Sequence, residues 1–185
     1  MTGLIILAIA IAVVGYAIFI YNDLVSKRQL KEEGWSGIDV QLKRRTDLIP
    51  NLMETVKGYM GHERETLEAV TQARAAATAG ANAGPAERSA LEGALSGALG
   101  RLLAIAESYP DLKANTTFLE FQSALRNVED EIQMARRYYN GAVRNLNTTV
   151  ESFPSNIVAN AFKFEKAEYF ELENEADRAV PQVKF

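Results

Sequence analysis

The sequence predicts an all-α protein, in which an N-terminal transmembrane helix continues into an antiparallel bundle of three long helices and a short C-terminal helix. Three observations lead to this fold class. Residues 3–21 contain no charged side chain. Two later stretches repeat apolar residues at alternating steps of three and four, which is the spacing of one helix face. Strand-like alternation of apolar and polar residues is absent over any useful length, so packed helices are the simplest way to bury these faces.

The N-terminal apolar run is long enough to cross a bilayer. At about 1.5 Å per residue, residues 3–21 extend roughly 28 Å, close to the hydrocarbon thickness of a membrane. Tyr21 ends the run, as an interfacial aromatic residue does. A cleaved signal peptide is the alternative, but it requires a basic segment before a shorter apolar stretch, and no Lys or Arg precedes Lys27. The pattern favours a retained anchor.

The flanks of this anchor predict its orientation. Lys27, Arg28 and Lys31 follow the run, so the positive-inside rule places the N-terminus outside and the rest of the chain in the cytoplasm of a single-pass cell-membrane protein. Small residues also recur on one face of the anchor, where they would let a second transmembrane helix approach closely. The alternative is that alanine and glycine are simply common in membrane helices. The candidate packing face consists of Ala8, Ala12 and Gly15.

The first cytoplasmic helix is predicted from an apolar heptad pattern that follows the anchor. Arg45 interrupts this pattern and Pro50 lies inside it. A proline either kinks a helix or begins a new one, and a kink is favoured because the apolar spacing continues across Pro50. The helix fades in the alanine-rich residues 73–79, before a flexible loop at residues 80–85. The predicted inward positions are Trp35, Ile38, Leu42, Ile49, Leu52, Val56, Tyr59 and Val70.

Two further long helices follow the loop. The second is predicted over residues 86–108 and is ended by Tyr109-Pro110. The third begins at a capping box formed by Thr117 and Glu120, and a coiled-coil-like apolar seam then continues to Phe153-Pro154. The inward positions of the third helix include Phe118, Leu125, Val128, Ile132 and Tyr139.

The C-terminal part is predicted to hold a short helix and an acidic tail. The expected division of the chain is therefore an anchor at residues 1–21, a cytoplasmic bundle at residues 22–154, and a short helix with a tail that packs on the bundle at residues 155–185.

The composition argues against most chemistry. The chain has no cysteine, one histidine and a net charge of −4, which exclude thiolate sites and argue against nucleic acid as a partner. His62-Glu63 resembles the start of a zinc-protease motif, but the second histidine that this motif needs is replaced by Thr66. The acidic run at residues 129–131 is more typical of a solvated helix face than of a cation site. We predict no catalytic residue, metal or cofactor.

Arg45 is the most unusual charged residue, because it occupies a heptad position that is otherwise apolar. A buried guanidinium needs a carboxylate partner. Asp47 is too near along the same helix, so the partner is expected on the third helix, at Glu129 or Glu131. Such an ion pair would be an architectural lock unless solvent can reach it.

These residues together resemble the LemA family of bacterial membrane proteins. The resemblance covers essentially the whole chain, and the run from Asp39 to Tyr59 is its most specific part. The matching stretches are Tyr21-Asn22-x-Leu24-Val25, Trp35-x-x-Ile38-Asp39-Val40-Gln41-Leu42-Lys43-Arg44-Arg45, Asp47-Leu48-Ile49-Pro50-Asn51-Leu52, Glu54-Thr55-Val56-Lys57-Gly58-Tyr59, His62-Glu63, Tyr109-Pro110-x-Leu112-Lys113-Ala114-Asn115, Ala135-Arg136-Arg137-x-Tyr139-Asn140, Phe153-Pro154-Ser155-Asn156 and Val183-x-Phe185.

The resemblance implies one N-terminal anchor, an extracytoplasmic N-terminus and a helical cytoplasmic part, with no established enzymatic activity. It also implies two possible associations, with the making of magnetosome membranes and with membrane metallopeptidases. From the small-residue face of the anchor, the amphipathic helix that continues from it and the scarcity of catalytic residues, we expect a non-enzymatic membrane protein that forms homo-oligomers and organises or remodels the membrane. The alternative is a cytoplasmic-facing adaptor that tethers an unidentified protein partner, such as a membrane protease or sensor.

Overall fold

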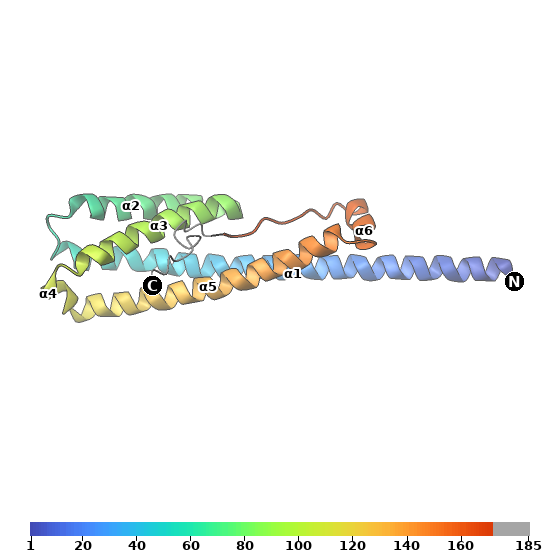
Figure 1. Ribbon diagram of the computed structural model, residues 1–185, viewed down its shortest axis with the longest axis horizontal. Helices are drawn as coiled ribbons and strands as arrows, with labels where there is room; N and C mark the ends of the chain where they lie inside the picture. Colours follow the sequence, from blue (N-terminus) through green and yellow to red (C-terminus); the bar gives the residue numbers. More distant parts are fainter. Residues whose placement is uncertain (172–185) are drawn as a thin grey trace, which may run out of the picture. The chain divides into compact units, whose positions relative to one another are not determined.

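The computed structural model describes residues 1–171, and all of its regular structure is helical (Figure 1). This confirms the predicted all-α class. The end of the predicted acidic tail and the closing Val183-x-Phe185 lie outside the described residues. The helices are α1 (Thr2–Lys57), α2 (Arg64–Ala79), the 3-10 turn η1 (Gly80–Asn82), α3 (Pro85–Ala106), α4 (Pro110–Lys113), α5 (Thr116–Glu151) and α6 (Ser155–Ala161).

The chain forms two compact units. The first contains Met1–Gly37 and Ala135–Tyr169, which are the beginning of α1, the end of α5, α6 and the segment after it. The second contains Ile38–Met134 together with Phe170 and Glu171. Each unit has its own apolar core, so α1 and α5 each contribute one part of their length to each core.

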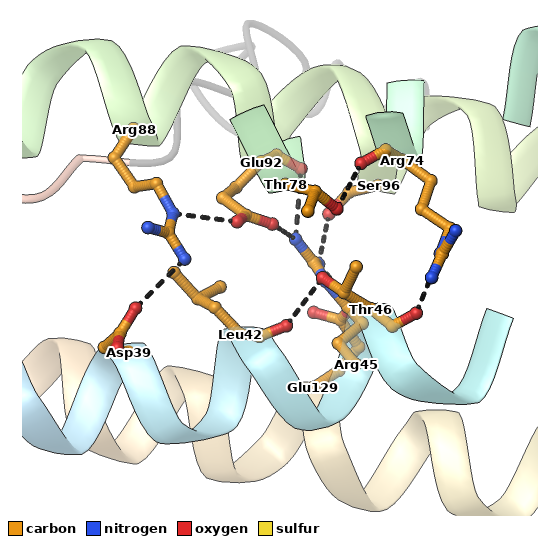
Figure 2. Close-up of polar contacts among 10 residues, drawn as sticks. All are labelled: Asp39, Leu42, Arg45, Thr46, Arg74, Thr78, Arg88, Glu92, Ser96 and Glu129. Carbon is orange, nitrogen blue, oxygen red and sulfur yellow. Dashed lines mark hydrogen bonds and ion pairs between the residues drawn. The ribbon is translucent and has the colours of Figure 1, made fainter. Parts of the chain in front are cut away.

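Helix α1 continues through Pro50 without interruption. Proline has no amide hydrogen, so the carbonyl of Thr46, four residues earlier, loses its usual helical donor. The side chain of Arg74 on α2 replaces that donor, because its Nε–H donates to Thr46 O at 3.1 Å (Figure 2). A residue from another helix therefore satisfies the group that the proline leaves unpaired.

The helix that continues from the apolar run ends earlier than the apolar pattern predicts. The pattern extends to Val70, whereas α1 ends at Lys57 and the chain reverses before α2 begins at Arg64. Val70 is still buried, but it reaches the core from α2. Met60 in the connecting turn takes the buried position next to this break, and Tyr59 is exposed. Two separate helices, α1 and α2, therefore share an apolar spacing that in the sequence is typical of one continuous helix.

The third long helix begins at a different cap from the predicted one. Asn115 Oδ1 accepts the backbone N–H of Phe118 at 3.0 Å, so Asn115 caps α5 and Thr117 lies within its first turn. Asparagine is among the strongest N-cap residues, and it satisfies a donor that has no partner within the helix.

The apolar positions of both units are largely buried. Phe118 and Leu125 on α5 pack with α1, α2 and α3 residues in the core of the second unit, while Trp35 in the first unit is only partly buried. The residues of the predicted inward set that the structure buries are Ile38, Leu42, Ile49, Leu52, Val56, Phe118, Leu125, Val128, Ile132 and Tyr139.

Candidate functional site

The first feature of interest is the apolar beginning of α1, which the rest of the chain leaves uncovered. Every large apolar side chain from Leu4 to Phe19 is exposed. Among the described residues α3 is also long and apolar enough to cross a membrane, but its apolar side chains line the core of the second unit. An exposed apolar helix of this length requires an apolar solvent. Ala8, Ala12 and Gly15 lie within it and are exposed too.

The C-terminal end of this apolar run is held by a small apolar core. Ile20 and Leu24 on α1 are buried with side chains from the end of α5 and from the α6 region, so contact with the rest of the unit starts where the run ends. No flexible linker separates the apolar run from this core, because both belong to the continuous helix α1. The other buried members of this core are Leu146, Val150, Ala159 and Phe164.

Aromatic rings surround this core. The Tyr21 ring lies 4.8 Å from the ring of Phe162 and 5.8 Å from that of Phe164, between ring centroids. The Arg28 guanidinium lies over the Phe164 ring at 5.2 Å, an arrangement that attracts a cation to the ring face. The junction of α1 with α6 is thus an aromatic cluster with a cation at its edge.

Farther along, α1 and α5 approach so closely that one contact position has no room for a side chain. A Cβ atom placed on Gly34 would lie 3.0 Å from the Cα of Tyr139. The neighbouring Trp35 ring packs on the Tyr139 ring with 5.4 Å between centroids. The Tyr139 hydroxyl donates to the backbone oxygen of Glu168 at 2.9 Å. Burial, reinforced by the negative charge of Glu168, raises the pKa of Tyr139 to about 12.

The second feature is a network of charges inside the second unit, centred on Arg45 (Figure 2). Arg45 is fully buried, and its Nη1 donates to Glu129 Oε1 on α5 at 2.6 Å and to Ser96 Oγ on α3 at 2.8 Å. Its Nη2 donates to Glu92 Oε2 on α3 at 2.5 Å and to the Glu92 backbone oxygen at 3.2 Å. One guanidinium therefore joins three helices. The structure pairs Arg45 with Glu129, while Glu131 is exposed.

Glu92 extends the network to a second arginine. Its other carboxylate oxygen accepts the Nε–H of Arg88 at 3.0 Å, and Arg88 Nη2 donates to Asp39 Oδ1 at 3.2 Å. Arg88 also donates to the backbone oxygen of Ala81. Glu92 is therefore a buried carboxylate between two guanidinium groups, which offsets the cost of removing its charge from water.

The expectations from sequence did not include Arg88, Glu92 and Ser96. A signal was present, because Arg88 and Glu92 precede Leu95, Leu99 and Leu102 at helical spacing and so share their buried face. The burial of Arg88 and Glu92 could be predicted only by seeking the carboxylate partner of Arg45 on every helix.

The arrangement of this network is suited to holding helices together. Arg45 and Glu92 are inaccessible to solvent, and each charge already has a partner of opposite sign. Within residues 1–171 no three His, Asp or Glu side chains converge to hold a metal ion. An open cavity of about 460 Å³ lies elsewhere in this unit, lined by residues such as Lys57, Leu67 and Thr71, and its Arg64 is already paired with Glu68 at 2.7 Å.

The exposed apolar helix and the helical bundle that follows it define a membrane-associated all-α protein. Comparison with known proteins agrees, because the sequence profile described as LemA family matches residues 34–185. The chain belongs to the LemA family. The match begins at Gly34, after the apolar run.

Three relatives illustrate the range of similarity. Protein LemA of Metamycoplasma hominis is 29% identical over 153 residues, which cover 80% of this chain and 69% of that protein. Magnetosome protein MamQ 2 of Paramagnetospirillum magneticum is 33% identical over 86 residues, 45% of this chain and 32% of that protein. Magnetosome protein MamQ of Magnetospirillum gryphiswaldense is 24% identical over 209 aligned positions, 96% of this chain and 77% of that protein.

Proposed function

We propose that this chain is a non-enzymatic, single-pass membrane protein that assembles into homo-oligomers and thereby organises or remodels the membrane. Its N-terminus lies outside and its bundle lies in the cytoplasm. Two observations support this proposal, the first for assembly and the second for a role at membranes. Ala8, Ala12 and Gly15 are small residues on an uncovered helix, where they let a second anchor pack closely. The relatives named as magnetosome proteins support a role at membranes for this chain.

The observation that carries the proposal is the rigid support of the anchor. Ile20 and Leu24 are buried against α5 and α6, and α1 has no break between the apolar run and this core. The tilt of the anchor therefore fixes the orientation of the supporting unit. Neighbouring anchors that pack side by side would align their cytoplasmic units, and repeated alignment imposes one curvature on the membrane. A flexible junction would uncouple the orientation of the anchor from that of the supporting unit.

Inserting Gly-Ser-Gly-Ser after Ser26 tests this function. The insertion interrupts α1 between the apolar core and the Gly34 contact, so regular oligomers seen by electron microscopy of detergent-extracted protein should become irregular or dissociate. The matched control is the same insertion after Asn82, in the turn between α2 and α3, which should leave the assembly intact. Oligomers of unchanged size and regularity in both variants would contradict the proposal. A monomer that co-purifies with one other protein would favour the adaptor function instead.

The proposed topology has its own test. A reporter fused after Phe185 should be active on the cytoplasmic side only, because the basic residues Lys27, Arg28 and Lys31 follow the anchor. Extracytoplasmic activity of the reporter would reverse the orientation without affecting the assembly argument.

A further inference from the structure

The α5–α6 turn, α6 and the residue after α6 carry unusually exposed apolar side chains. Phe153 is 81% exposed, and Ile157 and Phe162 are each 60% exposed. These two phenylalanines are more exposed than any other described aromatic side chain outside the N-terminal apolar run. Single exposed apolar residues are common on protein surfaces, but three within ten positions on one corner are a patch. We call residues 152–163 the apolar corner.

The apolar corner also lacks charge. Residues 152–162 contain no Asp, Glu, Lys or Arg, and the first charged residue is Lys163 at the end. Charged residues make up 24% of the chain, so a stretch of this length would hold about two or three by composition alone. An uncharged segment that exposes large apolar side chains and is ended by a lysine suits contact with a lipid surface better than contact with water.

The position of the corner identifies the surface that covers it. Helix α5 runs antiparallel to α1 here, because Tyr139 packs beside Trp35 while Val150 shares a core with Ile20. The end of α5 after Val150 therefore lies beside the turn of α1 that precedes Ile20, inside the uncharged run. Ala17 in that turn is partly covered. Figure 1 shows α6 beside this part of α1.

Tyr21 and Phe162 fix the depth of the corner. Tyr21 ends the uncharged run and lies where an interfacial aromatic residue is expected. The Phe162 ring packs on it with 4.8 Å between centroids, so Phe162 is level with the end of the run. The basic Arg28, seven residues after Tyr21, lies over the Phe164 ring of the same aromatic cluster.

We propose that the apolar corner inserts into the interface of the bilayer leaflet on the bundle's side, as a second membrane contact beside the anchor. Phe153, Ile157 and Phe162 enter the boundary between headgroups and acyl chains. Lys163 stays at the headgroups. The contact widens the membrane footprint of the chain on one side of α1 and on one leaflet, which gives the anchor a preferred rotation and favours bending of that leaflet. The inference rests on the proposed anchor and deepens the proposed membrane role.

Depth-dependent quenching tests this contact. The chain has no cysteine, so single cysteines for a fluorescent label can be placed at will in the full-length protein. The variants Phe153→Cys and Ile157→Cys probe the corner, reconstituted in phosphatidylcholine–phosphatidylglycerol vesicles that contain lipids spin-labelled near the headgroup. Phe19→Cys reports on the anchor. Val40→Cys is the matched control, because Val40 is 59% exposed, nearly as much as Ile157, and lies nineteen positions after Tyr21.

The expected result is strong quenching by the labelled lipids at positions 153 and 157, at least about half of that at position 19, with weak quenching at position 40. Aqueous iodide should give the opposite order. Corner labels that iodide quenches, or that both quenchers fail to reach because a second protein copy covers them, would overturn the inference while position 19 keeps its lipid quenching. If position 19 also loses lipid quenching, the proposed anchor itself fails.

Discussion

In the first compact unit α1 meets α5 mainly through apolar and aromatic side chains, whereas in the second unit buried charges are added to the apolar contacts of α1 with α3 and α5. The contact around Ile20, Leu24 and Tyr139 is stabilised by burial and close approach, and each apolar residue makes its contribution nearly independently. The contact around Arg45 and Glu92 depends on completeness, since every buried charge needs its partner. The two regions should therefore respond differently to the loss of a single group.

The largest effect is expected in the charged region. Glu92→Ala leaves Arg45 and Arg88 buried without their shared carboxylate and should lower the free energy of unfolding by about 3–5 kcal/mol. Urea unfolding in a mild detergent, followed by circular dichroism, measures the change. The control Glu131→Ala removes an exposed carboxylate from α5 and should stay within about 0.5 kcal/mol of the wild type. Similar losses in the two variants would mean that the network contributes no more than a surface charge.

Replacing the two central charges with apolar groups tests whether the loss in Glu92→Ala comes from leaving a charge without its partner. Arg45→Met combined with Glu92→Met removes both central charges, so the double variant should be more stable than Glu92→Ala alone. Arg88 keeps its contacts with Asp39 and Ala81 in this variant. A double variant that is less stable than Glu92→Ala would show that the charges contribute more than mutual compensation.

An apolar truncation in the second unit provides the contrast with these charge substitutions. Leu125→Ala on α5 removes a buried side chain and should cost about 2–5 kcal/mol, depending on how far the core relaxes around the cavity. The exposed Met134 on the same helix serves as the control, and Met134→Ala should have little effect. The loss at Leu125 should be insensitive to salt, because no charge is uncovered. Equal unfolding midpoints for the two variants would contradict the assigned core face of α5.

Much of this core could be predicted from sequence, because burial of residues such as Leu42 and Ile132 follows from their spacing alone. The end of α1 could not, since Met60 and Val70 preserve apolar character across a reversal of the chain. Spacing records which face is apolar but not which helix carries it. Gly58 and Gly61, which flank the reversal, were the available sign of a break.

The charged network was only half predictable for a related reason. Arg45 interrupts an apolar seam, which indicates a buried charge. Its ion-pair partner Glu129 lies on α5, the helix on which a partner was expected. Glu92 could not be assigned, because its role depends on how α3 aligns with α1, and sequence spacing within one helix contains no information on alignment between helices. The same limit applies to Arg74, which compensates Pro50 from another helix.

A smaller effect is expected at the close approach of the apolar region. Alanine normally stabilises a helix interior relative to glycine, and Gly37→Ala, where nothing lies within 4 Å of the new Cβ, should gain roughly 0.5–1 kcal/mol. Gly34→Ala should instead lose about 1–2 kcal/mol, because the new methyl group meets the backbone of Tyr139 and separates the helices. Opposite signs from two glycines three positions apart identify a packing contact. Stabilisation by both substitutions would show that α5 can move away without cost.

The smallest effect at neutral pH is expected at Tyr139. Tyr139→Phe keeps the ring on Trp35 but removes the hydroxyl that donates to the Glu168 backbone oxygen, so it should cost about 1 kcal/mol.

The folded-state pKa of Tyr139, about 12, lies above the ordinary value of 10, so the wild-type fold favours the neutral phenol. This stabilisation is fully present below pH 10 and is lost as the pH rises through 12. The stability advantage of the wild type over Tyr139→Phe should therefore shrink above pH 10. Titration of the other groups is common to the wild type and Tyr139→Phe, so the difference between these two proteins isolates the contribution of Tyr139. A constant difference between wild type and Tyr139→Phe up to pH 12 would mean that the phenolate is accommodated at the contact, and the apolar character assigned to this region would then be wrong at its centre.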